Sequence, residues 1–200
     1  MDSKLSRRSL IVAVPAALVV ANLPSNAVAL TVEEARALVD QVVGDVNRVI
    51  NSGKSESAMI GDFERIFAKY ADVTYIGLSV LGPAGRSASA ADRSAYLKAF
   101  QGYISRKYGR RFREFIGGQI EVTGARPLKS FFEVVSTAKL KGQAPFDLRW
   151  HVFDKNGKKQ FFNLIIEGVN MLAAERTEIG AMLDKRKGDV GALAADLTRI

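Results

Sequence analysis

The 200-residue sequence has no cysteine, one tryptophan and one histidine. The lack of cysteine excludes disulfides, thiolate metal sites, a cysteine nucleophile and a lipoprotein anchor. A single histidine, His151, cannot complete a histidine-based zinc site, and its place on the polar side of an expected strand favours a surface or structural role over catalysis. Phosphate-loop, Gly-x-Ser-x-Gly and His-Glu-x-x-His motifs are also missing. We therefore expect no metal site, no cofactor and no enzymatic activity.

No apolar run after residue 29 is long enough to cross a membrane. The first 29 residues have the parts of a cleaved export signal: a basic start with Arg7 and Arg8, a short apolar run over residues 10–20, and the small residues Ala27-Val28-Ala29. The paired arginines fit both a Sec signal and a twin-arginine signal, which leaves the export route open. We expect residues 1–29 to be removed and residues 30–200 to form a single domain outside the cytoplasm.

The chain carries a formal net charge of +8, and loss of Asp2, Lys4, Arg7 and Arg8 with the signal lowers it to +6. Apolar residues make up 48% of the chain, as expected for a globular protein. On an exported protein, excess positive charge suggests an anionic lipid surface or an acidic partner. The export signal argues against nucleic acid.

Two basic clusters stand out. The first holds Arg106, Lys107, Arg110, Arg111 and Arg113, and the second spans residues 185–187. Such runs are usually the solvated face of a helix whose aromatic residues pack inward. The alternative is a docking surface for anionic lipid or a partner protein, with these candidate residues: Arg106, Arg110, Arg111 and Arg113.

Hydrophobic periodicity divides the expected domain into three parts. Helical spacing covers residues 31–50, 57–70 and 73–80 and continues beyond Ser89, and it returns over residues 171–187 and from 189 onward. Between these helices, apolar and polar residues alternate over residues 120–122, 132–139, 146–153 and 161–167. Consecutive strands with short links predict an α+β fold: an antiparallel sheet of about four strands with helices packed over one face.

Aromatic residues at apolar positions, Tyr75 and Phe162 among them, are expected to face inward, and the spacing leaves open whether they surround a cavity or fill a core. Pocket walls are expected on the apolar face of each helix or strand. We single out nine such residues as candidate ligand contacts: Phe63, Phe67, Ile76, Phe100, Ile104, Trp150, Val152, Leu164 and Ile166.

Three carboxylates are candidate general bases. Glu133 and Glu167 fall on polar strand positions, so a solvated role is expected for both. Asp72 lies beside an apolar helical segment and is the best candidate for a pocket acid with a raised pKa. No spacing pairs these carboxylates.

Two stretches, residues 70–82 and 161–170, together with Arg86, Arg93-Ser-Ala-Tyr-Leu-Lys-Ala-Phe100, Tyr108 and Arg176, resemble the periplasmic MlaC family, also called toluene-tolerance proteins. The resemblance extends over essentially the whole expected domain. It implies a periplasmic phospholipid-binding component of an ABC transport system, which moves lipid between an inner-membrane transporter complex and an outer-membrane lipoprotein complex. It also implies an apolar pocket for acyl chains with the headgroup near its mouth.

The chain departs from the family pattern at Lys159, Asn163 and Asn170, where tryptophan, aspartate and serine are common. These departures concern the cargo more than the fold, and a hopanoid-related lipid is an alternative to phospholipid. Two further alternatives are an α+β enzyme that uses Asp72 on a small apolar substrate, and an adaptor with a solid core that binds only protein.

Overall fold

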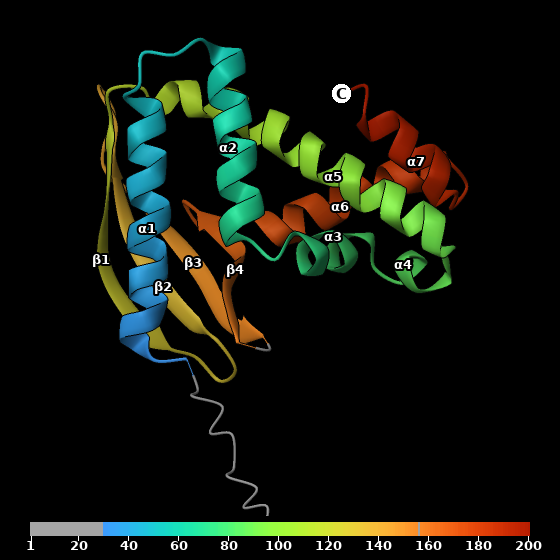
Figure 1. Cartoon of the computed structure of the whole chain (residues 1–200), viewed down its shortest axis with the longest axis horizontal. Coiled ribbons are helices and arrows are strands. Elements are labelled where there is room, and N and C mark those ends of the chain that lie inside the picture. The colour runs from blue at the N-terminus through green and yellow to red at the C-terminus, as the bar shows by residue number, and fades with distance from the viewer. Residues whose placement is uncertain (1–29, 156) are drawn as a thin grey trace, which may run out of the picture.

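The computed structural model describes residues 30–155 and 157–200, without the side chains of Phe112 and Arg113. The expected export signal over residues 1–29 lies outside the described residues. Five antiparallel strands form one open sheet whose order follows the sequence (Figure 1). They are β1 (Gln119–Pro127), β2 (Phe132–Lys139), β3 (Phe146–Lys155), β4 (Lys158–Ile166) and β5 (Val169–Asn170).

Helices precede and follow the sheet, which confirms the predicted α+β class. In the described part they are α1 (Val32–Ile50), α2 (Glu56–Tyr70), α3 (Val73–Leu81), α4 (Ala84–Ser87), α5 (Ala90–Arg111), the 3₁₀ turn η1 (Phe112–Phe115), α6 (Met171–Lys185) and α7 (Val190–Leu197). Among these residues, no helix is both long and apolar enough to span a membrane.

The helix starts follow from capping side chains. Thr31 and Glu34 form a capping box, in which each side chain bonds to the other's backbone N–H. The backbone N–H of Asp92 donates to Ser89 Oγ at 3.0 Å and begins α5. Asp189 caps α7 in the same way.

Helix α1 lies across one face of the sheet, and α3, α5, α6 and α7 form a second group beside it (Figure 1). The side-chain amide of Asn47 ties α1 to the first strand: Nδ2 donates to the Ile120 carbonyl at 2.9 Å and Oδ1 accepts from the Ile120 N–H at 3.0 Å. The core therefore sits between this sheet face and the two helical groups.

Strand alternation confirms the predicted inner face on β2 and β3, where Val134, Leu148, Trp150 and Val152 are buried. On β4 the expected inward position of Phe162 is met in part: Phe162 is half-buried and lines the cavity described below. The register shifts between His151 and Val152, so that Val152 pairs with Phe161, and one extra residue reverses the alternation.

Phe161 is therefore buried, although the alternation predicts an outward position for it. The Phe162 ring also packs against Phe131, Phe153 and Tyr75. Tyr75 is 38% exposed rather than inward.

A two-residue hairpin joins β4 to the short strand β5, which the sequence had not indicated as a strand. Glu167 and Gly168 both have positive φ, at 50° and 81°, as a two-residue turn of this kind requires. Asn170 then caps α6 by accepting from the Ala173 N–H at 3.1 Å. The hairpin thus sets where α6 leaves the sheet.

Candidate functional site

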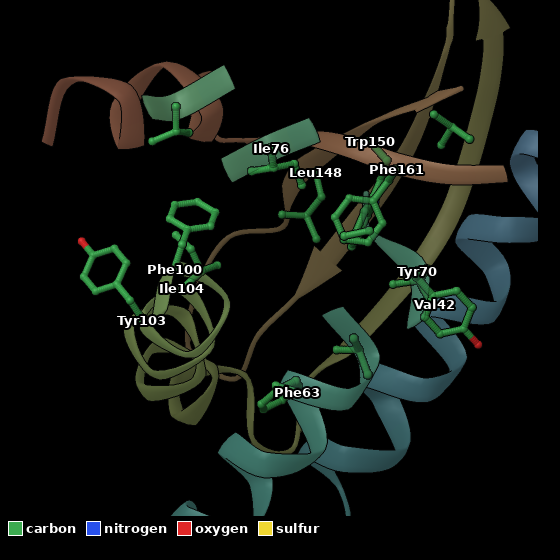
Figure 2. Close-up of a cluster of buried hydrophobic side chains, with 14 of the residues drawn as sticks. Val42, Phe63, Tyr70, Ile76, Phe100, Tyr103, Ile104, Leu148, Trp150 and Phe161 are labelled. Carbon is green, nitrogen blue, oxygen red and sulfur yellow. The ribbon is translucent and has the colours of Figure 1, made fainter. Parts of the chain in front are cut away.

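An apolar cavity of about 140 Å³ lies between the inner sheet face and the helices (Figure 2). Residues of α1, α2, α3, α5, α6, β3 and β4 line it. Figure 2 shows Phe63, Ile76, Ile104 and Trp150 reaching the same region from different elements. Because nearly all wall side chains are hydrophobic, the cavity suits an apolar ligand.

The structure brings seven of the nine candidate contact residues to this cavity: Phe63, Phe67, Ile76, Ile104, Trp150, Leu164 and Ile166. The other two lie elsewhere in the core. Phe100 packs tilted against Tyr96 between α5 and α3, and Val152 is fully buried on β3.

A second cavity of about 190 Å³ adjoins the first. The two share wall residues, namely Val46, Tyr108, Trp150, Leu164 and Ile166. The far side of the second cavity is polar, with Arg111, Glu114, Gln143 and Glu167. The arrangement is therefore an apolar interior that leads to a polar rim.

The wall residue Trp150 is held in place by a buried hydrogen bond. Its indole Nε1–H donates to Ser136 Oγ on the neighbouring strand at 2.9 Å. Its ring meets Phe161 edge-on, with centroids 5.4 Å apart. With its polar atom satisfied, the indole presents only hydrocarbon to the cavities.

One carboxylate, Glu175 of α6, lines the first cavity and is only 3% exposed. Its Oε1 accepts from Lys107 Nζ at 2.7 Å and from the Tyr108 hydroxyl. Lys107 also donates to Glu178 at 2.5 Å, and Glu178 accepts from Tyr103 at 2.6 Å. This network ties α5 to α6 at one end of the cavity.

The network shifts the pKa of its members. Burial alone would lower the pKa of Lys107, but its hydrogen bonds to Glu175 and Glu178 outweigh burial and raise that pKa. Hydrogen bonds from Lys107 and Tyr103 lower the pKa of Glu178. Burial, reinforced by Glu175, raises the pKa of Tyr108. Lys107 therefore stays charged and its tyrosine neighbours stay neutral near pH 7.

Asp72, the candidate pocket acid, does not line either cavity. Its Oδ1 accepts from the Tyr75 N–H at 2.8 Å and so caps α3, and its Oδ2 lies 3.9 Å from Lys155 Nζ. Glu175 is the carboxylate at the cavity instead, but Oε1 is occupied and Oε2 is buried without a partner in the described chain. The candidate acid Asp72 is thus a helix cap, and the carboxylate at the cavity is part of the α5–α6 network.

Glu133 was expected to be solvated, and this is wrong. It is 5% exposed on the outer sheet face, where Arg126 donates to it at 2.6 and 2.9 Å. His151 Nε2 lies 3.6 Å from its other oxygen. The imidazole ring also packs on the Phe131 ring, with ring centroids 4.7 Å apart, so His151 has a structural role. In the described residues, no three ligand-type side chains converge as a metal site.

The candidate docking arginines differ in their contacts. Arg106 donates to the Leu197 carbonyl at 2.7 Å and Arg110 to the Ile200 carbonyl at 2.8 Å, so both hold the C-terminal segment. Arg111 is exposed at the rim of the second cavity. The side chain of Arg113 lies outside the described residues.

Each of the three residues that depart from the family pattern forms a hydrogen bond. Lys159 donates to Glu34 at 2.5 Å, and Asn170 caps α6. Asn163 lines the first cavity, and its Oδ1 accepts from the Leu172 N–H at 3.1 Å. Asn163 therefore positions the start of α6 at the cavity.

Sequence reasoning missed Glu175 and Lys107 as site residues. A signal was present, because Glu175 falls at helical spacing with the apolar residues Leu172 and Ile179. A charged residue on an apolar stripe indicates a buried ion pair, but its partner on another helix could not be identified from spacing.

Comparisons with known proteins agree with this geometry. A family described as "MlaC protein" matches residues 40–199. The intermembrane phospholipid transport system binding protein MlaC of Haemophilus influenzae is 28% identical over 108 residues, or 52% of this chain. The chain spans about half the length of that relative, at 50%.

A phospholipid-binding protein from Ralstonia solanacearum, solved in complex with a phospholipid, has a similar fold. The TM-score is 0.71 at 19% identity, over 82% of this chain and 95% of that one. At this identity the likeness concerns the fold.

Proposed function

Since the matched segment covers most of its length, the chain belongs to the MlaC family, and from that premise we propose that it binds phospholipid in the two adjoining cavities and carries it between membranes. The observation that carries the proposal is the apolar first cavity, which opens through a shared wall to a polar rim. This arrangement provides hydrocarbon for acyl chains and polar groups for a headgroup.

The energetics favour a carrier without catalytic groups. Two acyl chains contain about 30 methylene groups, so exposing them to water costs more than ~20 kcal/mol at ~0.8 kcal/mol each. A carrier needs only an interior as apolar as the bilayer, together with a way in. The wall residues supply that interior, and Asp72, the candidate base of an enzyme, caps α3 away from both cavities.

The expected export signal and the family together support a periplasmic location. The proposed partners are an inner-membrane ABC transporter complex and an outer-membrane lipoprotein complex, with transient contact to a membrane surface. The two relatives named above are described as phospholipid transport and phospholipid-binding proteins, which supports phospholipid as the ligand.

The cavities, at about 140 and 190 Å³, are smaller than the roughly 300–1,000 Å³ of typical ligand pockets. A bound acyl chain must therefore displace the side chains of the shared wall. Of these, Leu164 and Val46 carry no polar atom and can change rotamer without breaking a hydrogen bond. We place the acyl chain along this wall and the headgroup near Arg111.

Native mass spectrometry of protein purified from cells tests the proposal. We expect a bound lipid, and extraction of that lipid identifies a phospholipid or, alternatively, a hopanoid. Protein that is free of lipid and takes none up from liposomes would contradict the proposal.

Variants locate the lipid. Leu164→Trp fills the shared wall and should lower the bound lipid, as should Trp150→Asp if it folds. Leu128→Trp, at the exposed turn after β1, is the matched control and should load normally. Normal loading of folded Leu164→Trp would place the lipid elsewhere.

A further inference from the structure

A second hollow, outside the cavities, gathers three arginines. It has a volume of about 550 Å³ and lies where α3, α4, α5 and α6 meet. Arg86 comes from α4, Arg93 from the first turn of α5, and Arg176 from α6. Ser79 and Gly82 complete the wall. We call this hollow the arginine pocket.

The three guanidinium groups lack acidic partners. None of the three forms an ion pair among the residues that the structure describes, although several other arginines of the chain do. Arg93 donates to the Gly85 carbonyl at 3.2 Å. For Arg86 and Arg176, the described residues offer no side-chain hydrogen bond at all. Most of the donors in this pocket are therefore unused.

In the part of the chain that the structure describes, no acidic residue lines the hollow beside the three arginines. Like charges that share a hollow repel one another, and the effect grows where protein replaces water. Arg93 adds to this because it lies in the first turn of a 22-residue helix, where the helix dipole disfavours a cation. Asp92, the acidic residue of that turn, is hydrogen-bonded to Ser89 Oγ at 2.6 Å.

Gly82 lies close to the guanidinium group of Arg176. A Cβ on this residue would lie 3.5 Å from Arg176 Nη2. Gly82 also has φ of 65°, a conformation that favours glycine. The turn after α3 thus brings backbone and the Arg176 guanidinium to the same wall of the pocket.

We propose that Arg86, Arg93 and Arg176 form a binding site for a phosphate group. A guanidinium group can donate two parallel hydrogen bonds to the oxygens of a phosphate. Three guanidinium groups together carry more positive charge than one carboxylate can neutralise. The Ser79 hydroxyl provides a further donor. The phosphate belongs either to a lipid headgroup at a membrane surface or to a small soluble phosphate. The site lies apart from the cavities and does not depend on the proposed function.

Titration calorimetry of the full chain with inorganic phosphate and with glycerol 3-phosphate tests the soluble source. Vesicles of phosphatidylcholine with and without phosphatidic acid, in a flotation assay, test the membrane source. Binding in either arm supports the site if it depends on the arginines, and the arm identifies the source.

Arg176→Gln and Arg86→Gln should each weaken binding roughly tenfold, as expected for loss of charge-assisted hydrogen bonds. Arg176→Lys should retain part of the affinity because it keeps charge but loses the fork. Lys141→Gln, at the exposed link between β2 and β3, is the control of equal charge change and should bind as the parent does.

Phosphate should also raise the unfolding temperature of the parent and of Lys141→Gln, but not that of Arg176→Gln. Absence of binding in both arms overturns the proposal. Binding that Arg176→Gln leaves unchanged, or arginine-dependent binding of an acidic peptide without binding of phosphate, overturns it as well.

Discussion

The indole of Trp150 and the hydroxyl of Ser136 form a buried hydrogen bond across β2 and β3 at 2.9 Å. Ser136 is fully buried, and its residue partner across the strands is Leu148 rather than Trp150, so the bond runs diagonally over the inner face. It fixes the orientation of the indole that lines both cavities.

Ser136→Ala leaves the Trp150 N–H buried without an acceptor. We expect a loss of about 1–3 kcal/mol in the free energy of unfolding, measured by urea denaturation. Trp150→Phe in the Ser136→Ala background should then cost less than Trp150→Phe alone, because the unsatisfied donor is removed. Additive losses would show that the bond contributes nothing.

Lys107→Met removes the ammonium from the buried Glu175. Breaking such a pair is expected to cost about 3 kcal/mol of folding free energy. Adding Glu175→Leu should recover part of this loss by removing the unpaired carboxylate. The control is Lys139→Met, since Lys139 and Glu121 form an exposed pair that is expected to contribute less than about 1 kcal/mol. Equal losses at both sites would argue against the α5–α6 network.

Gly77→Ala and Gly44→Ala are the same change in two helices with opposite expected outcomes. A Cβ at Gly77 would lie 2.7 Å from Leu97 Cδ2 and 3.2 Å from Phe100 Cδ1, so these two side chains must shift in the packed contact between α3 and α5, and stability falls. Nothing lies within 4 Å of a Cβ at Gly44 in α1, so higher helix propensity should stabilise by up to about 1 kcal/mol. Thermal unfolding checks both signs.

His151 predicts a pH dependence of stability. Burial lowers the pKa of this imidazole below its usual 6.5, and Glu133 offsets this only in part. The unfolded chain therefore binds more protons than the folded one between the two values, so stability is fully present above about pH 6.5 and falls as pH drops below it.

His151→Gln should flatten the dependence just below about pH 6.5, as measured by urea denaturation at a series of pH values. The lowered pKa values of Glu34, Asp62 and Glu178 take effect only at lower pH, below their usual values of 3.8–4.5. An identical slope in parent and variant would rule out a contribution from His151.

Arg111 is the candidate docking residue that is both described and not engaged with the C-terminal segment. Arg111→Glu should slow lipid transfer to acceptor membranes and reduce its salt sensitivity, because exposed charges act over roughly 10 Å at 0.1 M salt. Bound lipid should stay near normal. The control Lys158→Glu, at the exposed start of β4, should transfer lipid normally. Unchanged transfer by Arg111→Glu across a range of salt would make Arg111 a solvated residue only.

Local sequence rules predicted most elements of the fold. The capping residues Thr31, Ser89 and Asp189 and the alternation on β3 act within a few residues, so they are visible in the sequence. The bulge at Phe162 is not, because it depends on how β4 pairs with β3. It turns Phe161 to the interior, beside the half-buried Phe162 that also lines the first cavity.

Prediction of the site was limited by contacts between distant elements. Seven of nine expected residues line the cavity because inward-facing side chains of a small domain converge. Spacing alone could not separate Phe100, which fills the helical core, from Ile104 one turn later, which faces the cavity. Pairing of Glu175 with Lys107 joins residues 68 positions apart, beyond any local pattern.

Helix α5 contributes to both the arginine pocket and the first cavity, through Arg93 near its start and Ile104 further along. Eleven residues separate them in one continuous helix, which at 1.5 Å per residue is about 16 Å. That span is close to the hydrocarbon depth of one bilayer leaflet, roughly 15 Å. The continuous helix therefore fixes the spacing of the two sites, and a bare phosphate in the arginine pocket is too short to reach the first cavity.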